Sequence, residues 1–141
     1  KIKKHPLARA VRADKLCLAG ISATLTHYLK GEALEKIPLW QMISMNIESI
    51  KNRAESWKIR LGFGELTPGF SMVGGGSLPE ESMPTWLLSL PVNNPDRLTK
   101  QMRGLETPII ARIEEDRVLL DPRTVLPDED ELLIRQIKSL I

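Results

Sequence analysis

Cysteine and histidine are scarce in this sequence. Cys17 is its one cysteine, so the chain cannot close an internal disulfide or build a zinc site from several thiolates. The two histidines, His5 and His27, do not have the spacing of metal ligands. We therefore expect no metal ion and a location in the cytoplasm, where thiols stay reduced.

Long apolar runs are missing as well. No run approaches the roughly 20 residues that a membrane-spanning helix needs, so we expect no membrane partner. Lys1–Pro6 is not followed by the apolar stretch of a secretory signal. The first residue is Lys and not Met, and we expect the chain to be part of a longer protein. Aromatic residues make up only 4%, so the core must be built mainly from Leu, Ile, Val and Met.

The sequence also has no large excess of positive or negative charge, because the formal net charge is only +2. This value is too small to indicate nucleic-acid binding. Basic residues gather within residues 1–15, and residues 128–131 are all acidic. A basic arm can attract phosphate, but from charge alone a solvated helix face is the simpler interpretation.

Two long segments have apolar residues at three- and four-residue steps, which predicts helices. The first covers residues 13–30, with Asp14 in its first turn and Gly31 as its stop. The second follows a short helix that begins at Pro38. Its apolar face consists of Ile47, Ile50, Ala54, Trp57 and Leu61.

From Glu65 onward, short apolar runs alternate with glycine and proline, which is typical of strands and turns. A final helix is expected after Asp128, which forms a capping box with Glu131. A small antiparallel sheet with covering helices buries each apolar face economically, so the predicted fold class is α+β. The predicted segments are strands at 66–73 and 86–90, a helix at 95–103, and a hairpin of 109–113 with 118–120.

Arg9 and Arg12 are the first candidate binding residues. They lie three positions apart, and on a helical turn this spacing places two guanidinium groups on one face. Such a pair can bind a phosphate or carboxylate in a bidentate manner, which a lysine cannot do. Two surface arginines without a ligand are the plainer interpretation of this segment alone.

Gly74, Gly75, Gly76 and Ser77 form the second candidate. Consecutive glycines allow backbone amides to approach an anion closely, although the Gly-Lys-Ser/Thr ending of a P-loop is absent. A turn between two strands also explains the motif. In the third candidate, Asp121-Pro122-Arg123, the acidic and basic side chains either pair or line a site, and a structural role is favoured because prolines fix the chain path.

The segment from His5 to Leu16, the loop from Gly74 to Pro79 and the stretch from Arg123 to Pro127 occur in this order in bacterial selenocysteine synthases. From about Lys3 to its end, the chain resembles this family. The resemblance implies the small domain of an aspartate-aminotransferase-like pyridoxal-phosphate enzyme of fold type I. It also implies a helical linker arm, residues 1–62, attached to a large domain that the chain lacks, and a small domain, residues 63–141.

The family converts seryl-tRNA(Sec) to selenocysteinyl-tRNA(Sec) with selenophosphate, as an assembly of dimers. The resemblance implies that Arg9 and Arg12 hold the anionic selenium donor, and that the Gly74–Ser77 loop lies near the active-site mouth. The cofactor lysine of the family stands in a Gly-Asp-Lys-Leu segment that has no match here. Asp14-Lys15-Leu16 matches a later family segment instead. We therefore expect no catalytic residue and no covalently bound pyridoxal phosphate in this chain.

Two alternatives stay open from the sequence. A related pyridoxal-phosphate lyase or aldolase could use the same fold on a small phosphorylated amino compound, with the arginine pair binding its phosphate. A non-catalytic interaction module, which dimerises or binds RNA, is the second alternative. The sequence upstream of His5 would distinguish them, because the transferase requires a cofactor lysine and a tRNA-binding domain.

Overall fold

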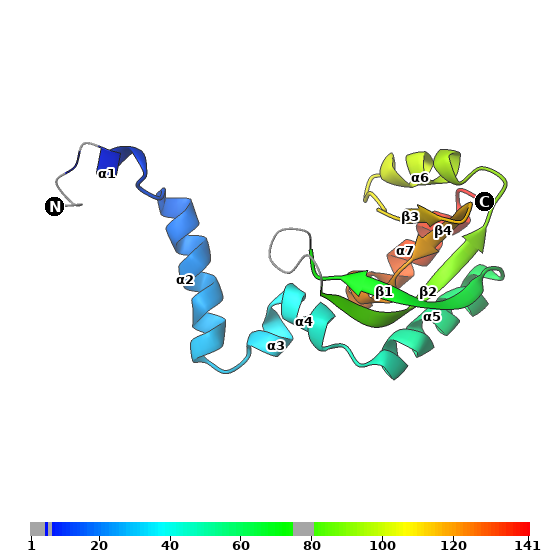
Figure 1. Cartoon of the computed structure of the whole chain (residues 1–141), viewed down its shortest axis with the longest axis horizontal. Helices are drawn as coiled ribbons and strands as arrows, with labels where there is room; N and C mark the ends of the chain where they lie inside the picture. Colours follow the sequence, from blue (N-terminus) through cyan, green and yellow to red (C-terminus); the bar gives the residue numbers. More distant parts are fainter. Residues whose placement is uncertain (1–4, 6, 75–80) are drawn as a thin grey trace. The chain divides into compact units, whose positions relative to one another are not determined.

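The computed structural model describes His5, residues 7–74 and residues 81–141, with the side chains of Arg9 and Ala10 outside this description (Figure 1). The chain divides into two compact units, Lys1–Gln41 and Met42–Ile141. Most of the glycine motif lies outside the described residues. Among the described helices, none is long and apolar enough to cross a membrane.

The first unit is helical. The helix predicted over residues 13–30 is confirmed as α2, and it starts one residue after Asp14, whose Oδ1 accepts from the Cys17 amide at 2.8 Å. Gly31 follows with a φ of 72°, a left-handed conformation that ends helices readily. The short helix α3 was not predicted. The elements are α1 (Leu7–Ala10), α2 (Lys15–Leu29), α3 (Ala33–Lys36) and α4 (Pro38–Ser44), which crosses into the second unit.

Helix α2 buries none of its residues within the described part of the chain. Its apolar stripe, at the predicted three- and four-residue steps, is about half exposed: Leu18 52%, Ile21 56%, Leu25 54% and Tyr28 48%. A 15-residue helix is marginal in water without tertiary packing. The stripe is therefore an apolar surface that the described residues of this chain leave uncovered.

The second unit contains a four-stranded antiparallel sheet of order β1-β2-β4-β3, which confirms the α+β fold class. Strand β2 pairs with β1 over Ser82–Ser89, but with β4 only over Leu88–Pro91. The end of the β1–β2 hairpin therefore extends beyond β4 as a two-stranded ribbon. The strands are β1 (Glu65–Met72), β2 (Ser82–Pro91), β3 (Arg112–Glu114) and β4 (Arg117–Leu120).

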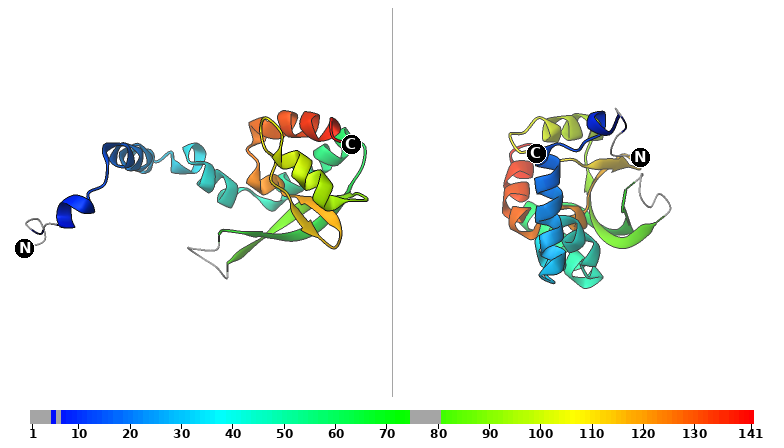
Figure 2. Two further views of the ribbon diagram at one scale, coloured as in Figure 1. Left: turned by 90° about the horizontal axis from the view of Figure 1, so that it is seen from above. Right: turned by 90° about the vertical axis from the view of Figure 1, so that its left-hand side faces the viewer.

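Helices cover one face of this sheet. Helix α5 (Ile47–Leu61) packs on β2 and against α7 (Asp130–Lys138), and both helices lie on the same side of the strands (Figure 2). Helix α6 (Pro95–Arg103) begins after the cap Asn94 and completes the layer. The core contains Trp57, Leu61, Leu88, Leu90, Leu98, Met102, Ile109, Val118, Leu120, Leu133, Ile134 and Ile137.

Two local predictions were wrong. The strand expected over 109–113 begins only at Arg112, because Ile109 turns inward and its amide donates to the Met102 carbonyl at 3.0 Å. Asp128 does not cap the last helix, since it lies inside a 3-10 turn, Pro127–Glu129. The Glu129 carboxylate accepts from the Leu126 amide at 3.4 Å instead.

Candidate functional site

The Asp121 carboxylate joins three elements in the second unit. It follows β4 and caps the 3-10 turn Pro122–Thr124 by accepting from the Arg123 amide at 3.0 Å. Its Oδ2 accepts from the Ser71 hydroxyl of β1 at 2.5 Å, and its Oδ1 accepts from the Thr85 hydroxyl of β2 at 2.9 Å. Both hydroxyl side chains are buried, at 4% and 2% exposure. Hydrogen bonds to a carboxylate are stronger than neutral ones, so these contacts fix the two strands firmly.

The Arg123 guanidinium is buried beside this carboxylate, with 5% of the residue exposed. It donates to the Pro84 carbonyl of β2 at 2.7 Å and to the Met42 and Met45 carbonyls at 3.0 and 3.2 Å. Burial lowers the pKa of Arg123 and the nearby Asp121 charge offsets part of this, but an arginine remains protonated in proteins. Its partners are backbone carbonyls, so the side chain has a structural role, which is the interpretation that the sequence favoured.

Arg53 of α5 also contacts the segment Pro122–Val125, which follows Asp121. Its Nη1 donates to the Pro122 carbonyl at 2.7 Å, and its Nη2 donates to the Val125 carbonyl at 3.0 Å and to Asp130 at 2.5 Å. Arg53 was not among the residues predicted from the sequence. The available signal was its spacing, three residues after Ile50 and four before Trp57, which places a charge at the edge of the buried helix face.

A pocket of about 540 Å³ lies next to Asp121. Its walls are mainly apolar, and they can accommodate an apolar group of modest size. The Gln136 Oε1 atom in its lining is buried without a partner among the described residues. The lining residues are Ser71, Met72, Thr107, Pro108, Ile109, Ile110, Ala111, Arg112, Leu119, Leu120, Asp121, Thr124, Val125, Glu129, Leu132, Leu133 and Gln136.

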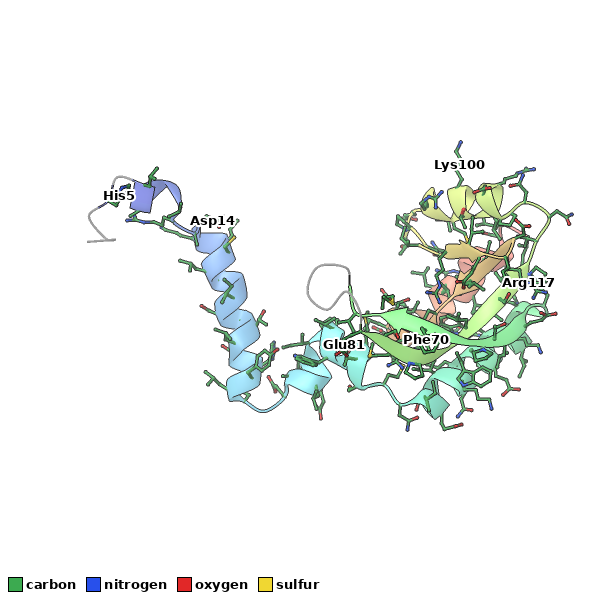
Figure 3. All side chains as sticks on the ribbon, viewed as in Figure 1. His5, Asp14, Phe70, Glu81, Lys100 and Arg117 are labelled. Carbon is green, nitrogen blue, oxygen red and sulfur yellow. The ribbon has the colours of Figure 1, made fainter. Side chains whose placement is uncertain are left out.

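The glycine motif stands between β1 and β2 in the sequence. Gly74 is described, with a φ of 134° that favours glycine and no atom within 4 Å of an added Cβ, whereas Gly75, Gly76 and Ser77 lie outside the described residues. Phe70 and Glu81, on either side of the motif, lie toward the same end of the hairpin (Figure 3). Ser71 and Thr85, which Asp121 binds, flank the motif along the chain.

The predicted arginine pair lies in the first unit. Arg9 is in the short helix α1, and its side chain is outside the described residues. Arg12 is exposed and follows the end of that helix, so the helical turn that would place both residues on one face does not extend to Arg12. Among the described residues, no three His, Cys, Asp or Glu side chains group as metal ligands.

A family model described as L-seryl-tRNA selenium transferase matches residues 1–126 of this chain. The chain belongs to the L-seryl-tRNA selenium transferase family. The matched range includes the arginine pair, the glycine motif, Asp121 and Arg123. The resemblance predicted from the three sequence motifs is thereby confirmed.

Curated relatives in this family are named L-seryl-tRNA(Sec) selenium transferase. The protein of Clostridium perfringens strain 13 is 38% identical over 149 residues, covering 99% of this chain and 32% of the relative. The Alkaliphilus oremlandii protein is 35% identical over 151 residues and 100% of this chain. The Geobacter sulfurreducens protein is 35% identical over 149 residues and 99% of this chain. The chain spans about a third of the length of these relatives, 32% in each case.

Proposed function

We propose that this chain is the C-terminal part of a pyridoxal-phosphate-dependent transferase that converts seryl-tRNA(Sec) to selenocysteinyl-tRNA(Sec) with selenophosphate. The observation that carries the proposal is the family match over residues 1–126. Alignment to a named selenium transferase over 99% of this chain, but 32% of the relative, supports its being one portion of such an enzyme.

The described residues of this chain do not fit pyridoxal phosphate. The cofactor requires a lysine in an enclosed site, and no lysine lines the 540 Å³ pocket. Lys15, in the Asp-Lys-Leu segment, is exposed at the first position of α2. In the proposed enzyme the cofactor would therefore be held by residues outside this chain, and it would activate the seryl group there.

Arg9 and Arg12 are proposed to bind the selenium donor, a multiply charged anion. Guanidinium groups bind phosphate oxygens in a bidentate manner and remain charged at every physiological pH. The exposure of Arg12 leaves its side chain accessible to a ligand. The Gly74–Ser77 loop is proposed to lie at the mouth of the same active site.

The wider organisation is also part of the proposal. Residues 1–62 are the arm that leads from a large domain, and residues 63–141 form the small domain of a fold-type-I enzyme. Helix α5, which ends at Leu61, packs on the sheet of that domain. The uncovered apolar stripe of α2 supports a larger protein, because such a surface is stable when other residues bury it. The whole enzyme is proposed to be a cytoplasmic assembly of dimers.

Transfer of radioactive selenium to tRNA tests the function. The full-length protein, supplied with pyridoxal phosphate, seryl-tRNA(Sec) and labelled selenophosphate, should yield label in the aminoacyl group. Seryl-tRNA(Ser) is the matched control and should remain unlabelled. Bound cofactor without any transfer would contradict the proposal and favour the lyase or aldolase alternative.

Borohydride reduction tests the assignment of the cofactor lysine. The 141-residue chain, incubated with pyridoxal phosphate and reduced, should carry no stoichiometric label, whereas the full-length protein should carry one label outside these residues. Stoichiometric label on Lys15 would overturn the assignment.

A further inference from the structure

The pocket beside Asp121 is enclosed by four segments of the second unit. One wall is a face of α7, because Leu132 and Leu133 lie four and three residues before Gln136 on that helix. The other walls are the end of β1, the end of β4 with the turn that follows it, and residues 107–112. The pocket volume of about 540 Å³ falls within the range of small-molecule sites, about 300 to 1,000 Å³. The pocket is therefore large enough to enclose a compact molecule.

The charged groups of the lining are either already bonded or exposed. The Asp121 carboxylate accepts from two hydroxyl groups and from the Arg123 amide. Arg112 and Glu129 are exposed, so their charges stay in contact with water. A charged ligand would lose its hydration on entering the apolar interior without gaining a buried partner of opposite charge. The pocket therefore favours a neutral and largely apolar ligand.

Gln136 adds a hydrogen-bonding group to the apolar wall of α7. Its Oε1 atom is buried and accepts no hydrogen bond from the described residues. The last bond of a glutamine side chain turns readily, so the amide can present this oxygen to an occupant of the pocket. An N–H group in an aromatic ring is a donor only, so it would satisfy this oxygen without bringing a further polar atom that needs a partner.

We propose that this pocket is a binding site for a small, neutral aromatic molecule of the indole type, whose ring N–H donates to the Gln136 Oε1 atom. The apolar part of the ring is buried between α7 and residues 107–112. This activity is additional to the proposed transfer reaction, and it does not depend on that reaction. Because the ligand contacts segments far apart in the sequence, its binding should stabilise the second unit by mass action.

Indole and benzofuran are matched probes for this site. The two molecules have nearly the same size and shape, but benzofuran has an oxygen atom in place of the N–H group. Isothermal titration of the full-length enzyme with each probe measures the two Kd values. Indole should bind about three- to tenfold more tightly than benzofuran, which is the net effect of one neutral hydrogen bond. Bound indole should also slow amide hydrogen exchange in α7 and in residues 107–112.

Gln136→Met tests the hydrogen bond. Methionine keeps the length of the side chain and removes its polar atoms, and the variant should fold because the buried oxygen without a partner is removed with them. Its affinity for indole should fall by about three- to tenfold, to that for benzofuran, whereas its affinity for benzofuran should stay unchanged. Gln101→Met is the matched control, because Gln101 is exposed on α6 and is not in the pocket lining. This variant should bind both probes as the unmodified enzyme does.

Three results would overturn the proposal. The first is the absence of saturable indole binding to the full-length enzyme, which would show that the pocket takes no such ligand or is filled by other residues of the enzyme. The second is slowed exchange that appears elsewhere in the protein and spares α7 and residues 107–112. The third is a Gln136→Met variant that still prefers indole over benzofuran to the same degree.

Discussion

Arg53 of α5 and Asp130 of α7 form an ion pair in which both carboxylate oxygens accept from one guanidinium, at 2.5 and 3.1 Å. Their side chains are only 15% and 19% exposed. The same guanidinium binds the Pro122 and Val125 carbonyls. The pair therefore connects helices α5 and α7 to the segment that carries Asp121.

Removing Arg53 should destabilise the protein strongly. Arg53→Ala leaves a largely buried carboxylate and two carbonyls without their donors, so the free energy of unfolding should fall by about 3 kcal/mol. Arg60 is the matched control, because it pairs with Glu131 between the same helices but Glu131 is 85% exposed. Arg60→Ala should cost less than about 1 kcal/mol. Urea unfolding measures both free energies. Equal losses in the two variants would contradict the larger structural role given to the buried Arg53–Asp130 pair.

Two glycines should respond to alanine in opposite directions. A Cβ at Gly69 would lie 2.5 Å from the Leu87 Cδ1 atom, and Leu87 is buried, so Gly69→Ala should lower the free energy of unfolding by about 1–3 kcal/mol. Gly20 lies in α2 with no atom within 4 Å of an added Cβ. Gly20→Ala should increase the helix content of α2, since glycine costs about 0.5–1 kcal/mol inside a helix. Thermal unfolding measures the stability change of Gly69→Ala, and circular dichroism measures the helix content of Gly20→Ala. If Gly69→Ala raised the unfolding temperature, the close approach of Gly69 to Leu87 would be disproved.

The cap of α2 should depend on pH. The hydrogen bond from the Cys17 amide lowers the pKa of the Asp14 carboxyl below its usual 3.8. A lowered pKa means that the ionised cap stabilises the helix above about pH 4 and that this contribution is lost as pH falls through the lowered value. An NMR titration of the Asp14 carboxyl carbon and the Cys17 amide should give one midpoint below 3.8. Asp14→Asn keeps the hydrogen-bond acceptor but cannot ionise, so the Cys17 amide signal should no longer change with pH in this range. A midpoint above 3.8 in the unmodified protein would contradict the capping hydrogen bond.

The two arginines of the first unit should matter for turnover and not for folding. In the full-length enzyme, Arg9→Ala or Arg12→Ala should reduce turnover at limiting selenium donor by about ten- to a hundredfold, the effect of losing one charge-assisted contact. Lysine should not restore it fully, because an ammonium cannot bind two oxygens in a plane. Arg97→Ala, which removes an exposed arginine from α6, is the control. Wild-type turnover in both variants would contradict the binding role and would indicate that Arg9 and Arg12 are surface residues without a ligand.

The helices of this protein could be predicted because their signals are local. Ile50, Ala54, Trp57 and Leu61 recur with the period of a helix, and the structure buries all four on one face of α5. The helix predicted at 95–103 is α6, and its start also has a local cause, since the cap Asn94 and the first-turn Pro95 act within a few residues.

The site could not be predicted in the same way, because its contacts join distant residues. Asp121 meets Ser71 and Thr85, which lie 50 and 36 positions away, and Arg53 meets Asp130 across 77 positions. The periodicity of a single sequence carries no information about such pairs. The helical-turn argument does not extend to Arg12, because α1 ends at Ala10, and the binding role of Arg9 and Arg12 stays a prediction.

The four strands form two hairpins, and a single seam between Leu88–Pro91 of β2 and Arg117–Leu120 of β4 joins them. This seam must close across the connection that contains α6. Because the entropy of closing a loop grows by only about 0.6 kcal/mol for each doubling of its length, residues inserted near Gly104 would be tolerated. A residue inserted within the seam would turn each following side chain to the opposite face of the sheet. Natural length variation in this half of the protein should therefore concentrate after α6 and avoid the seam.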